Sequence, residues 1–388
     1  MITLNTADNA LKSFYLDAVT EALDCKANPL LAKIQRSTSD VVGKDVKKLV
    51  KYGVNGGISA GSETGGLPAS SETGNVTFTA SLKNLYGTIE ISDKALRASA
   101  SNEGAFVNLL NDEMQSLIKS ASYNFGRMLY GDGTGKIATV VEALSNNVLK
   151  LDTVTGVVEG MRIDFVLSDG SITDVQGVKV LSVDRKEKTI TIENSAGYGD
   201  YTGEVGVYVQ GSYEKEITGL KAIFDDANLY GVNRTNLSAL KPYTKDGVGA
   251  ISESVMQTAM DEIEEISGGQ VNFIVCSWGV RRALVEYFKQ YKTMMPSMEL
   301  EGGFKALSFN GIPIVADRFC PDGTMYLLNT DDFKIHQLCD WQWLEGEDGK
   351  ILKQVPGKPV YTATLVKYAE LMCERPNGQG RLTGITEA

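Results

Sequence analysis

The sequence predicts an α+β protein with a small all-β domain inserted into it. Three patterns support this class. Residues 102–130 carry one long amphipathic helical pattern, residues 137–212 carry short alternating strands, and residues 251–291 alternate helix, strand and helix. The chain has 388 residues, which is long enough for roughly two or three domains and therefore for an insertion of this size.

The composition narrows the classes of function. Hydrophobic residues make up 43% and charged residues 22% of the chain, which is typical of a globular protein rather than a disordered one. There are 49 acidic and 38 basic residues, so the formal net charge is −11. Tight binding of nucleic acid needs a basic surface that neutralises phosphates. This chain is therefore a poor candidate for tight binding of DNA or RNA.

Cysteine and histidine usage argues against a disulfide framework, a zinc site and histidine-based catalysis. The five cysteines are widely separated, without a C-x-x-C pair, as reduced thiols in a cytoplasm would be: Cys25, Cys276, Cys320, Cys339 and Cys373. His336 is the only histidine, and the alternation in "DDFKIHQL" predicts a structural place on a strand. The N-terminus shows no secretory signal, and no apolar run reaches the length of a membrane span.

The N-terminal third is predicted to hold a helix and a loop. Residues 7–26 repeat apolar side chains every fourth position, which predicts a short amphipathic helix. Residues 53–75, "GVNGGISAGSETGGLPASSETGN", are rich in Gly, Ser and Thr and cannot bury enough surface to order alone. A strand pattern begins at Val76. A protruding loop and a flexible linker are both compatible with this composition.

Residues 102–130 give the strongest helix prediction in the chain. One stripe of apolar side chains runs along it, formed by Phe106, Leu110, Met114, Leu117, Ala121, Phe125 and Met128. The helix is followed by "GDGTG", which could cradle a phosphate, hold a cation through Asp132 or end the helix. A phosphate loop precedes a helix and offers its N–H groups, whereas this loop follows one. Helix termination is therefore the preferred interpretation, with Gly131 as the left-handed residue.

The C-terminal half is predicted to form an α/β layer and long strands. Residues 251–267 form an amphipathic helix whose apolar face holds Ile251, Val255, Ala259, Ile263 and Ile266. "VNFIVCS" is a buried strand, and "WGVRRALVEYFKQYK" is a second helix. The carboxylates of "DEIEE" (261–265) fall on the polar face, and a solvated surface is preferred over a site. Trp341 and Trp343 share one side of a strand, where packing is preferred over stacking on a ligand.

Motifs of catalysis are missing from the sequence. It contains no G-x-S-x-G, no H-E-x-x-H, no Walker sequence and no G-x-G-x-x-G that opens a helix. The sequence therefore predicts a protein that is not an enzyme and that uses no cofactor and no metal.

Several stretches, in this order, resemble one known family. They are "LYGDGTG", "ITGLKAIFDDANLYGVNR", "FIVCSWGVRRAL", "FNGIPIVADRFCPDGTMYLLNTDDFKIHQ" and "CERPNGQGRLTGI". The chain is similar to the major capsid proteins of tailed bacteriophages, which have the Hong Kong 97-like fold, and the resemblance covers essentially everything outside residues 137–212. The single stretches are loose, and their order carries the likeness.

The resemblance implies a division of the chain. It gives an N-terminal arm with a short helix (1–52), an extended loop (53–92), a peripheral domain with the spine helix (93–136), the inserted β domain (137–212), an axial domain (213–340), the long strands of the peripheral domain (341–375) and a C-terminal return to the axial domain (376–388). Lys83 and Asn84 lie near the loop, but no motif assigns them the lysine–asparagine crosslink that some relatives form.

The resemblance also implies two groups of site residues. Residues with a structural role are Gly131, Asp132, Gly133, Gly135, Gly219, Leu220, Gly231 and Arg234. Residues of the extended loop that contact neighbouring subunits are Gly56, Gly57, Gly65, Gly66, Phe78, Leu82 and Tyr86. A glycine-rich arm can gain backbone hydrogen bonds by laying itself along a neighbour's sheet.

The function implied is that of a major capsid protein. Such a chain assembles with itself into hexamers and pentamers of an icosahedral head shell, contacts the packaged double-stranded DNA without specificity, and uses no membrane. Expected partners are a separate scaffolding protein, a portal at one vertex and, as a further candidate, a decoration protein. The expected location is the virion capsid, assembled in the host bacterial cytoplasm. The alternatives are an encapsulin-like compartment shell and an α/β enzyme.

Overall fold

The computed structural model describes residues 28–41, 43–94, 103–145, 147–193, 204–225, 227–291, 297–300, 304–346 and 349–388. The helix expected over residues 7–26 lies outside them. The chain divides into two units, of which the first comprises Met1–Lys33, Lys83–Leu220 and Gln337–Ala369 and the second Ile34–Leu82, Lys221–His336 and Glu370–Ala388.

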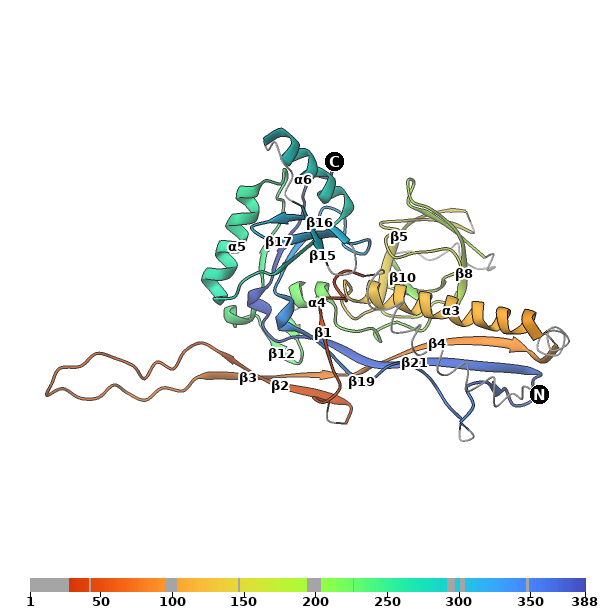
Figure 1. Cartoon of the computed structure of the whole chain (residues 1–388), viewed down its shortest axis with the longest axis horizontal. Coiled ribbons are helices and arrows are strands. Elements are labelled where there is room, and N and C mark those ends of the chain that lie inside the picture. The colour runs from red at the N-terminus through yellow and green to blue at the C-terminus, as the bar shows by residue number, and fades with distance from the viewer. Residues whose placement is uncertain are drawn as a thin grey trace. The chain divides into compact units, whose positions relative to one another are not determined.

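The first unit is built on long strands and one long helix. Strands β4 (Lys83–Ser92) and β21 (Val360–Cys373) pair antiparallel, from Lys83 opposite Ala369 to Ser92 opposite Val360. They belong to a five-stranded sheet that also contains β1 (Gln35–Ser37), β19 (Phe333–Trp343) and β20 (Lys353–Gln354), of which β1 and the start of β19 fall in the residue ranges of the second unit. Helix α3 (Glu103–Met128) lies along β4 (Figure 1).

The apolar stripe of α3 explains where the helix packs. Met114, Ile118 and Phe125 are at most 3% exposed. The Leu117 side chain packs close to Gly87 of β4. A Cβ added to Gly87 would lie only 3.1 Å from Leu117 Cδ1, so a larger residue there would crowd the helix. The predicted helix is confirmed; of its described stripe, Met114, Phe125 and Met128 are buried, whereas Leu117 and Ala121 are half-buried. The side chains of the predicted stripe residues 106 and 110 lie outside those that the structure describes.

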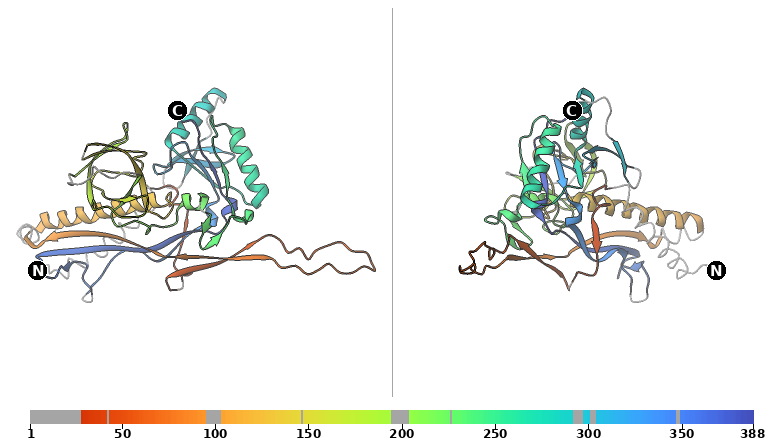
Figure 2. Two further views of the ribbon diagram at one scale, coloured as in Figure 1. Left: turned by 180° about the vertical axis from the view of Figure 1, so that it is seen from behind. Right: turned by 60° about the vertical axis from the view of Figure 1, so that its left-hand side comes forward.

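An all-β barrel occupies the segment where the sequence predicts an insertion. Its strands are β5 (Lys136–Ser145), β6 (Val148–Leu151), β7 (Arg162–Leu167), β8 (Val178–Asp184), β9 (Thr189–Ile192) and β10 (Val205–Val209), which close in the order β10-β5-β6-β9-β8-β7 (Figure 2). The barrel core runs from Ile137 to Val207 and includes Leu149, Phe165 and Ile190, which are fully buried. Closure pairs the strand edges with one another, so a small barrel can be stable with only its own core.

The second unit contains a seven-stranded mixed sheet. Its order is β13 (Tyr243–Lys245), β22 (Gly380–Leu382), β18 (Met325–Leu328), β14 (Phe273–Cys276), β17 (Ile312–Ala316), β16 (Phe304–Phe309) and β15 (Ser297–Leu300). Helices α5 (Glu253–Ser267) and α6 (Trp278–Tyr291) share one face, because both pack on Ile274 and Cys276 of β14. Short helix α4 (Leu220–Asp225) packs on the other face, where the rings of Phe224 and Tyr326 are 5.4 Å apart.

Helix α5 ends where the sequence predicts, but it begins at Glu253, two residues later than predicted, and one apolar residue is misplaced. The Ser252 side chain accepts from the Val255 N–H, and Gly268 ends the helix with a left-handed φ of 62°. Met256 and Ile263 are fully buried, whereas Ile266 is 58% exposed. The prediction that Ile266 belongs to the apolar face is wrong, since this residue lies in the last turn, beyond the contact of α5 with the sheet.

Two short two-stranded sheets complete the second unit. One is β2 (Asp45–Tyr52) with β3 (Gly74–Ser81), and the other is β11 (Asn228–Leu229) with β12 (Val232–Asn233). Three 3₁₀ turns occupy Ser238–Leu240, Thr330–Asp332 and Pro376–Gly378. The β2–β3 pair is the root of the glycine-rich loop.

Candidate assembly surfaces

The glycine-rich segment forms the end of the β2–β3 hairpin. Beyond Tyr52 and Gly74 the two segments of the hairpin run side by side without regular strand pairing (Figure 1). The predicted loop residues Gly56, Gly57, Gly65 and Gly66 all lie here. Three apolar side chains stand in solvent, with Val54 88%, Ile58 87% and Leu67 94% exposed. These three side chains leave apolar surface on the loop that a partner could cover.

The root of the hairpin is fixed to its own unit through Phe78. This side chain is fully buried, and its ring lies 5.4 Å from that of Tyr230. The prediction that Phe78 contacts a neighbouring subunit is wrong for this reason. Leu82 is half-buried and its N–H donates to Lys44 O at 3.0 Å. Tyr86 lies in β4, 59% exposed and edge-on to Tyr368, and so remains accessible to a neighbour.

Tyr230 is a residue that sequence reasoning missed. It lies with Gly231 in the turn between β11 and β12, where both have positive φ, 49° and 79°. Its hydroxyl donates to Leu371 O (3.0 Å) and accepts from Cys373 N (3.1 Å), and its carbonyl accepts from Thr79 N (2.9 Å). Burial raises the Tyr230 pKa well above its usual value. The dipeptide "YG" between two short apolar stretches was the available signal, because two-residue hairpin turns need positive φ.

Arg234, expected to be structural, is buried just after this turn. It is 2% exposed, and its Nη1 donates to the carbonyl oxygens of Ile223 (2.9 Å) and Leu240 (3.3 Å). These bonds connect helix α4 to the first 3₁₀ turn. A buried guanidinium that donates to carbonyl groups fixes loop geometry rather than serving a ligand.

The "GDGTG" loop ends α3, but through other residues than predicted. Helix α3 ends at Met128, and Gly131 N donates to Met128 O at 3.0 Å. The positive φ values belong to Gly133 (85°) and Gly135 (83°), so the assignment of the left-handed position to Gly131 is wrong. The tight turn after Met128 already satisfies that carbonyl. The Asp132 carboxylate accepts from Thr134 N at 3.0 Å, which holds the loop itself.

The two ends of the barrel insertion meet at this loop. Glu214 N donates to Thr134 O at 2.7 Å, and Glu216 N donates to Gly133 O at 3.3 Å. A side chain at Gly219 would overlap the Met128 carbonyl oxygen, and Leu220 N donates to Leu129 O at 2.7 Å. The predicted structural residues from 131 to 135 and from 219 to 220 therefore form one junction.

A buried ion pair closes the junction. The Arg127 guanidinium bonds the Glu216 carboxylate, and the two side chains are 8% and 3% exposed. Arg127 Nε also contacts Asn124 Oδ1 at 3.3 Å. The partners are 89 positions apart, on either side of the barrel, so neither periodicity nor a local motif could have paired them.

Removal of the barrel is expected to leave the remaining protein folded. The barrel core draws its buried residues from within the segment between Ile137 and Val207, and the segment's ends are already hydrogen-bonded at Thr134 and Glu214. A variant in which a short glycine linker replaces residues 137–211 should still unfold cooperatively. Its far-UV circular dichroism spectrum should lack only the contribution of the barrel strands. Circular dichroism during thermal unfolding measures this, and a non-cooperative, molten profile would contradict it.

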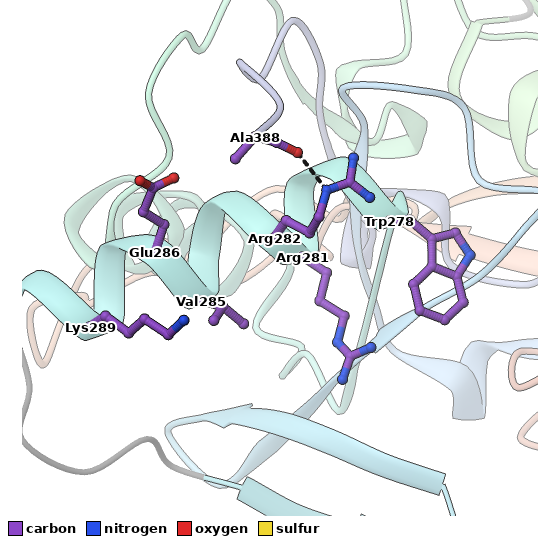
Figure 3. A pocket seen from close by; sticks show the side chains of 7 residues that line it. All are labelled: Trp278, Arg281, Arg282, Val285, Glu286, Lys289 and Ala388. Carbon is purple, nitrogen blue, oxygen red and sulfur yellow. Dashed lines mark hydrogen bonds between the residues drawn. The ribbon is translucent and has the colours of Figure 1, made fainter. Parts of the chain in front are cut away.

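A groove along α6 is the second candidate surface. It encloses about 540 Å³ and is lined by Trp278, Arg281, Arg282, Val285, Glu286, Lys289 and Ala388 (Figure 3). Trp278 is 51% exposed, and the Arg281 guanidinium lies 5.6 Å from its ring. Arg282 Nε donates to Ala388 O at 2.5 Å. An exposed tryptophan beside basic side chains is a combination enriched in protein interfaces.

Several reactive groups of the described residues are buried inside the fold. Burial raises the Cys276 pKa to about 12, which disfavours the nucleophilic thiolate. His336 is 2% exposed, and burial lowers its pKa, so the neutral ring is favoured. Lys367 Nζ donates to Gln337 Oε1 (2.8 Å) and Asp340 Oδ1 (2.5 Å). Trp341 and Trp343 are also buried, as the packing interpretation predicts.

The described residues offer neither a metal-binding cluster nor a helix that could cross a membrane. In the part of the chain that the structure describes, carboxylate, histidine and cysteine side chains form no group of three that could hold a metal ion. Likewise, none of the described helices combines the length and the apolar character needed to cross a membrane.

Asp332 is expected to make stability depend on pH. Burial raises its pKa from 3.8 to about 6, against the smaller opposing effect of Arg375. Because the pKa of Asp332 is higher in the folded state than in the unfolded chain, its protonated carboxyl group favours the folded state at pH values below the unfolded-state pKa. This contribution to stability is lost as the pH rises through about 6. Asp332→Asn should therefore gain stability relative to the wild type between about pH 4 and pH 7. Thermal unfolding across this range checks it, with the exposed Asp174→Asn as control; a pH-independent difference would contradict it.

Solved structures of capsids have the same fold. A chain of the cyanophage A-1(L) capsid asymmetric unit matches with a TM-score of 0.57 at 12% identity, over 95% of this chain and 93% of that chain. The capsid of Myoviridae phage XM1 gives 0.51 at 9% identity, over 93% and 92%. The capsid of the empty GTA particle gives 0.50 at 12% identity, over 93% and 91%.

The likeness lies in the fold and not in the sequence. The sequence matches no protein-family model, and no curated protein is similar enough to count as a relative. The match nevertheless extends over nearly the full length of both chains in each pair. The chain thus has the Hong Kong 97-like fold of phage major capsid proteins, and the predicted fold class is confirmed.

Proposed function

We propose that this protein is the major capsid protein of a tailed bacteriophage. It would assemble into hexamers and pentamers that form the icosahedral head shell around double-stranded DNA. The observation that carries the proposal is the capsid fold over 93–95% of the chain, with three capsids as structural neighbours. The role is structural rather than catalytic, and it needs no cofactor.

Two surfaces support assembly of identical copies. The hairpin loop exposes three large apolar side chains that a folded subunit cannot cover by itself, at Val54, Ile58 and Leu67. The α6 groove offers Trp278 with Arg281 and Arg282. Closed rings use heterologous contacts, in which two different surfaces of one chain meet. Many weak contacts made at once then hold each subunit in a shell.

The charge of the chain fits a container for DNA. A formal net charge of −11 opposes tight binding to a polyanion, so contacts with packaged DNA would be weak and non-specific. We further propose a scaffolding protein during assembly in the host cytoplasm, a portal at one vertex of the virion, and the inserted barrel as a place where a decoration protein could bind. The domain division given under Sequence analysis is part of the same proposal.

Electron microscopy of the purified full-length chain, with and without a candidate scaffolding protein, tests the proposal. Closed shells or isolated rings of five and six subunits are the expected result. A monomer at all concentrations, with or without the scaffolding protein, would contradict it. Shells that enclose a cellular enzyme rather than DNA in the native host would favour the encapsulin-like alternative.

A further inference from the structure

Backbone hydrogen bonds in the β2–β3 hairpin can be assigned residue by residue. The register places Asp45 opposite Ser81 and Tyr52 opposite Gly74. Lys44 O accepts from Leu82 N at 3.0 Å, so this pair is a hydrogen-bonded one. Hydrogen-bonded and non-hydrogen-bonded pairs alternate in antiparallel sheets. The N–H and C=O groups that face away from β3 are therefore those of Asp45, Lys47, Leu49 and Lys51.

The other edge of the hairpin agrees with this assignment. The same alternation turns Thr79 of β3 outward, and Thr79 N indeed donates to Tyr230 O at 2.9 Å. The outer edge of β3 is thus partly paired. Strand β2 has only β3 as a neighbour in its sheet, and no hydrogen bond of the described residues uses the outward groups of Lys47, Leu49 or Lys51. An unpaired strand edge is a template for another strand.

A groove runs beside this edge. It encloses about 640 Å³, with residues 48–54 on one side and residues that include Ile266, Asp332 and Arg375 on the other. Leu49 and Ile266 are each 58% exposed in it. The Lys48 ammonium bonds the Glu374 carboxylate at 2.9 Å, which ties β2 to the opposite wall. The groove is therefore partly apolar, and an ion pair connects its two walls.

The side chains at the edge specify the charge of an occupant. Lys47, Leu49 and Lys51 are exposed and, as alternate residues of a strand, point to one face. A strand paired here would place side chains directly opposite them, and opposite charges across a pair are stabilising. A second copy of β2 is disfavoured, because antiparallel pairing centred on Leu49 would put Lys47 against Lys51.

We propose that the outer edge of β2 binds an extended acidic segment of a separate protein. The segment adds a strand to the hairpin, with an apolar residue opposite Leu49 and carboxylates opposite Lys47 and Lys51. Backbone hydrogen bonds supply the affinity and the two lysines supply the selectivity for acidic sequences. The inference goes beyond shell formation, since a single subunit can bind such a strand whether or not it assembles.

Proline substitutions on the two edges of the hairpin test the backbone contact. Leu49→Pro removes an outward N–H of β2, and Thr77→Pro removes the outward N–H of the residue directly opposite, on β3. The probe is a fluorescent peptide with the repeat Glu-Thr-Leu-Thr-Glu, measured by anisotropy at low salt. We expect Leu49→Pro to weaken binding by about tenfold or more and Thr77→Pro to leave it unchanged.

Charge reversal tests the selectivity. The double variant Lys47→Glu/Lys51→Glu should lose the glutamate peptide and gain the matching Lys-Thr-Leu-Thr-Lys peptide. Circular dichroism verifies that every variant is folded as the wild type is. Absence of binding to the wild type, equal loss in Leu49→Pro and Thr77→Pro, or unchanged preference after charge reversal would each overturn the proposal. None of these readouts depends on shell formation, so the proposed function is tested separately.

Discussion

Glu216→Ala is expected to lower the free energy of unfolding by about 3–5 kcal/mol. The substitution leaves the Arg127 guanidinium, which is 8% exposed, without the carboxylate that neutralises it. An uncompensated buried charge costs far more than the loss of a surface ion pair, because the solvation that it gave up on folding is no longer replaced. Denaturant unfolding of the dissociated subunit, followed by fluorescence, measures the change.

A surface ion pair in the same unit is the matched control. Lys136 Nζ and Glu204 Oε1 are 2.9 Å apart, with side chains 32% and 62% exposed. Glu204→Ala should cost at most about 1 kcal/mol. The double variant Arg127→Met/Glu216→Leu should recover much of the stability lost in Glu216→Ala, since it removes both charges. Equal costs for Glu216→Ala and Glu204→Ala would show that the junction pair is not the buried anchor described here.

Replacement of Val54, Ile58 and Leu67 by serine is expected to abolish assembly while leaving the subunit as stable as before. These side chains are 87–94% exposed, so they contribute little to the folded subunit. Burying one such side chain in an interface is worth about 1.5–3 kcal/mol, so the triple variant loses roughly 5 kcal/mol or more per subunit in a shell. Light scattering and electron microscopy follow assembly, and thermal unfolding follows the subunit.

Apolar residues on the barrel provide the matched control for this prediction. Val141, Leu144 and Leu181 are 51–62% exposed and belong to strands β5 and β8. Serine at these three positions removes a similar amount of apolar surface from another part of the chain. Assembly should persist in this control. Shells formed by the hairpin variant would contradict the prediction, and loss of assembly in the control alone would assign the interface to the barrel instead.

Local patterns predicted the regular elements well. The stripe through Met114 and Phe125, the turn-separated strands of the barrel and the helix ended by Gly268 all appear in the structure. Each depends on periodicity or on a backbone preference within a few residues. The errors have the same origin. The spacing points to Gly131, whereas Gly133 and Gly135 have the positive φ values, because a spacing rule cannot say which of several nearby glycines turns.

Side chains at the candidate surfaces were predicted less well. Phe78 alternates with polar residues as an exposed strand residue could, yet it is fully buried against Tyr230. Ile266 continues the apolar repeat of α5, yet it lies in the last turn of the helix and its side chain is 58% exposed. In both cases a residue's exposure depends on a segment far away in the chain.

The sequence by itself determined the α+β class, the inserted all-β module, the long helix and the apolar faces, because these follow from side-chain periods of two and 3.6 residues. Tertiary structure alone decided which distant groups meet. Arg127 bonds Glu216, which follows the barrel in the chain, Tyr230 contacts Phe78 and the end of β21, and among the described strands β2 has one edge unpaired. The physical reason is that burial and hydrogen bonding are settled between segments brought together by folding, and no local pattern encodes that pairing.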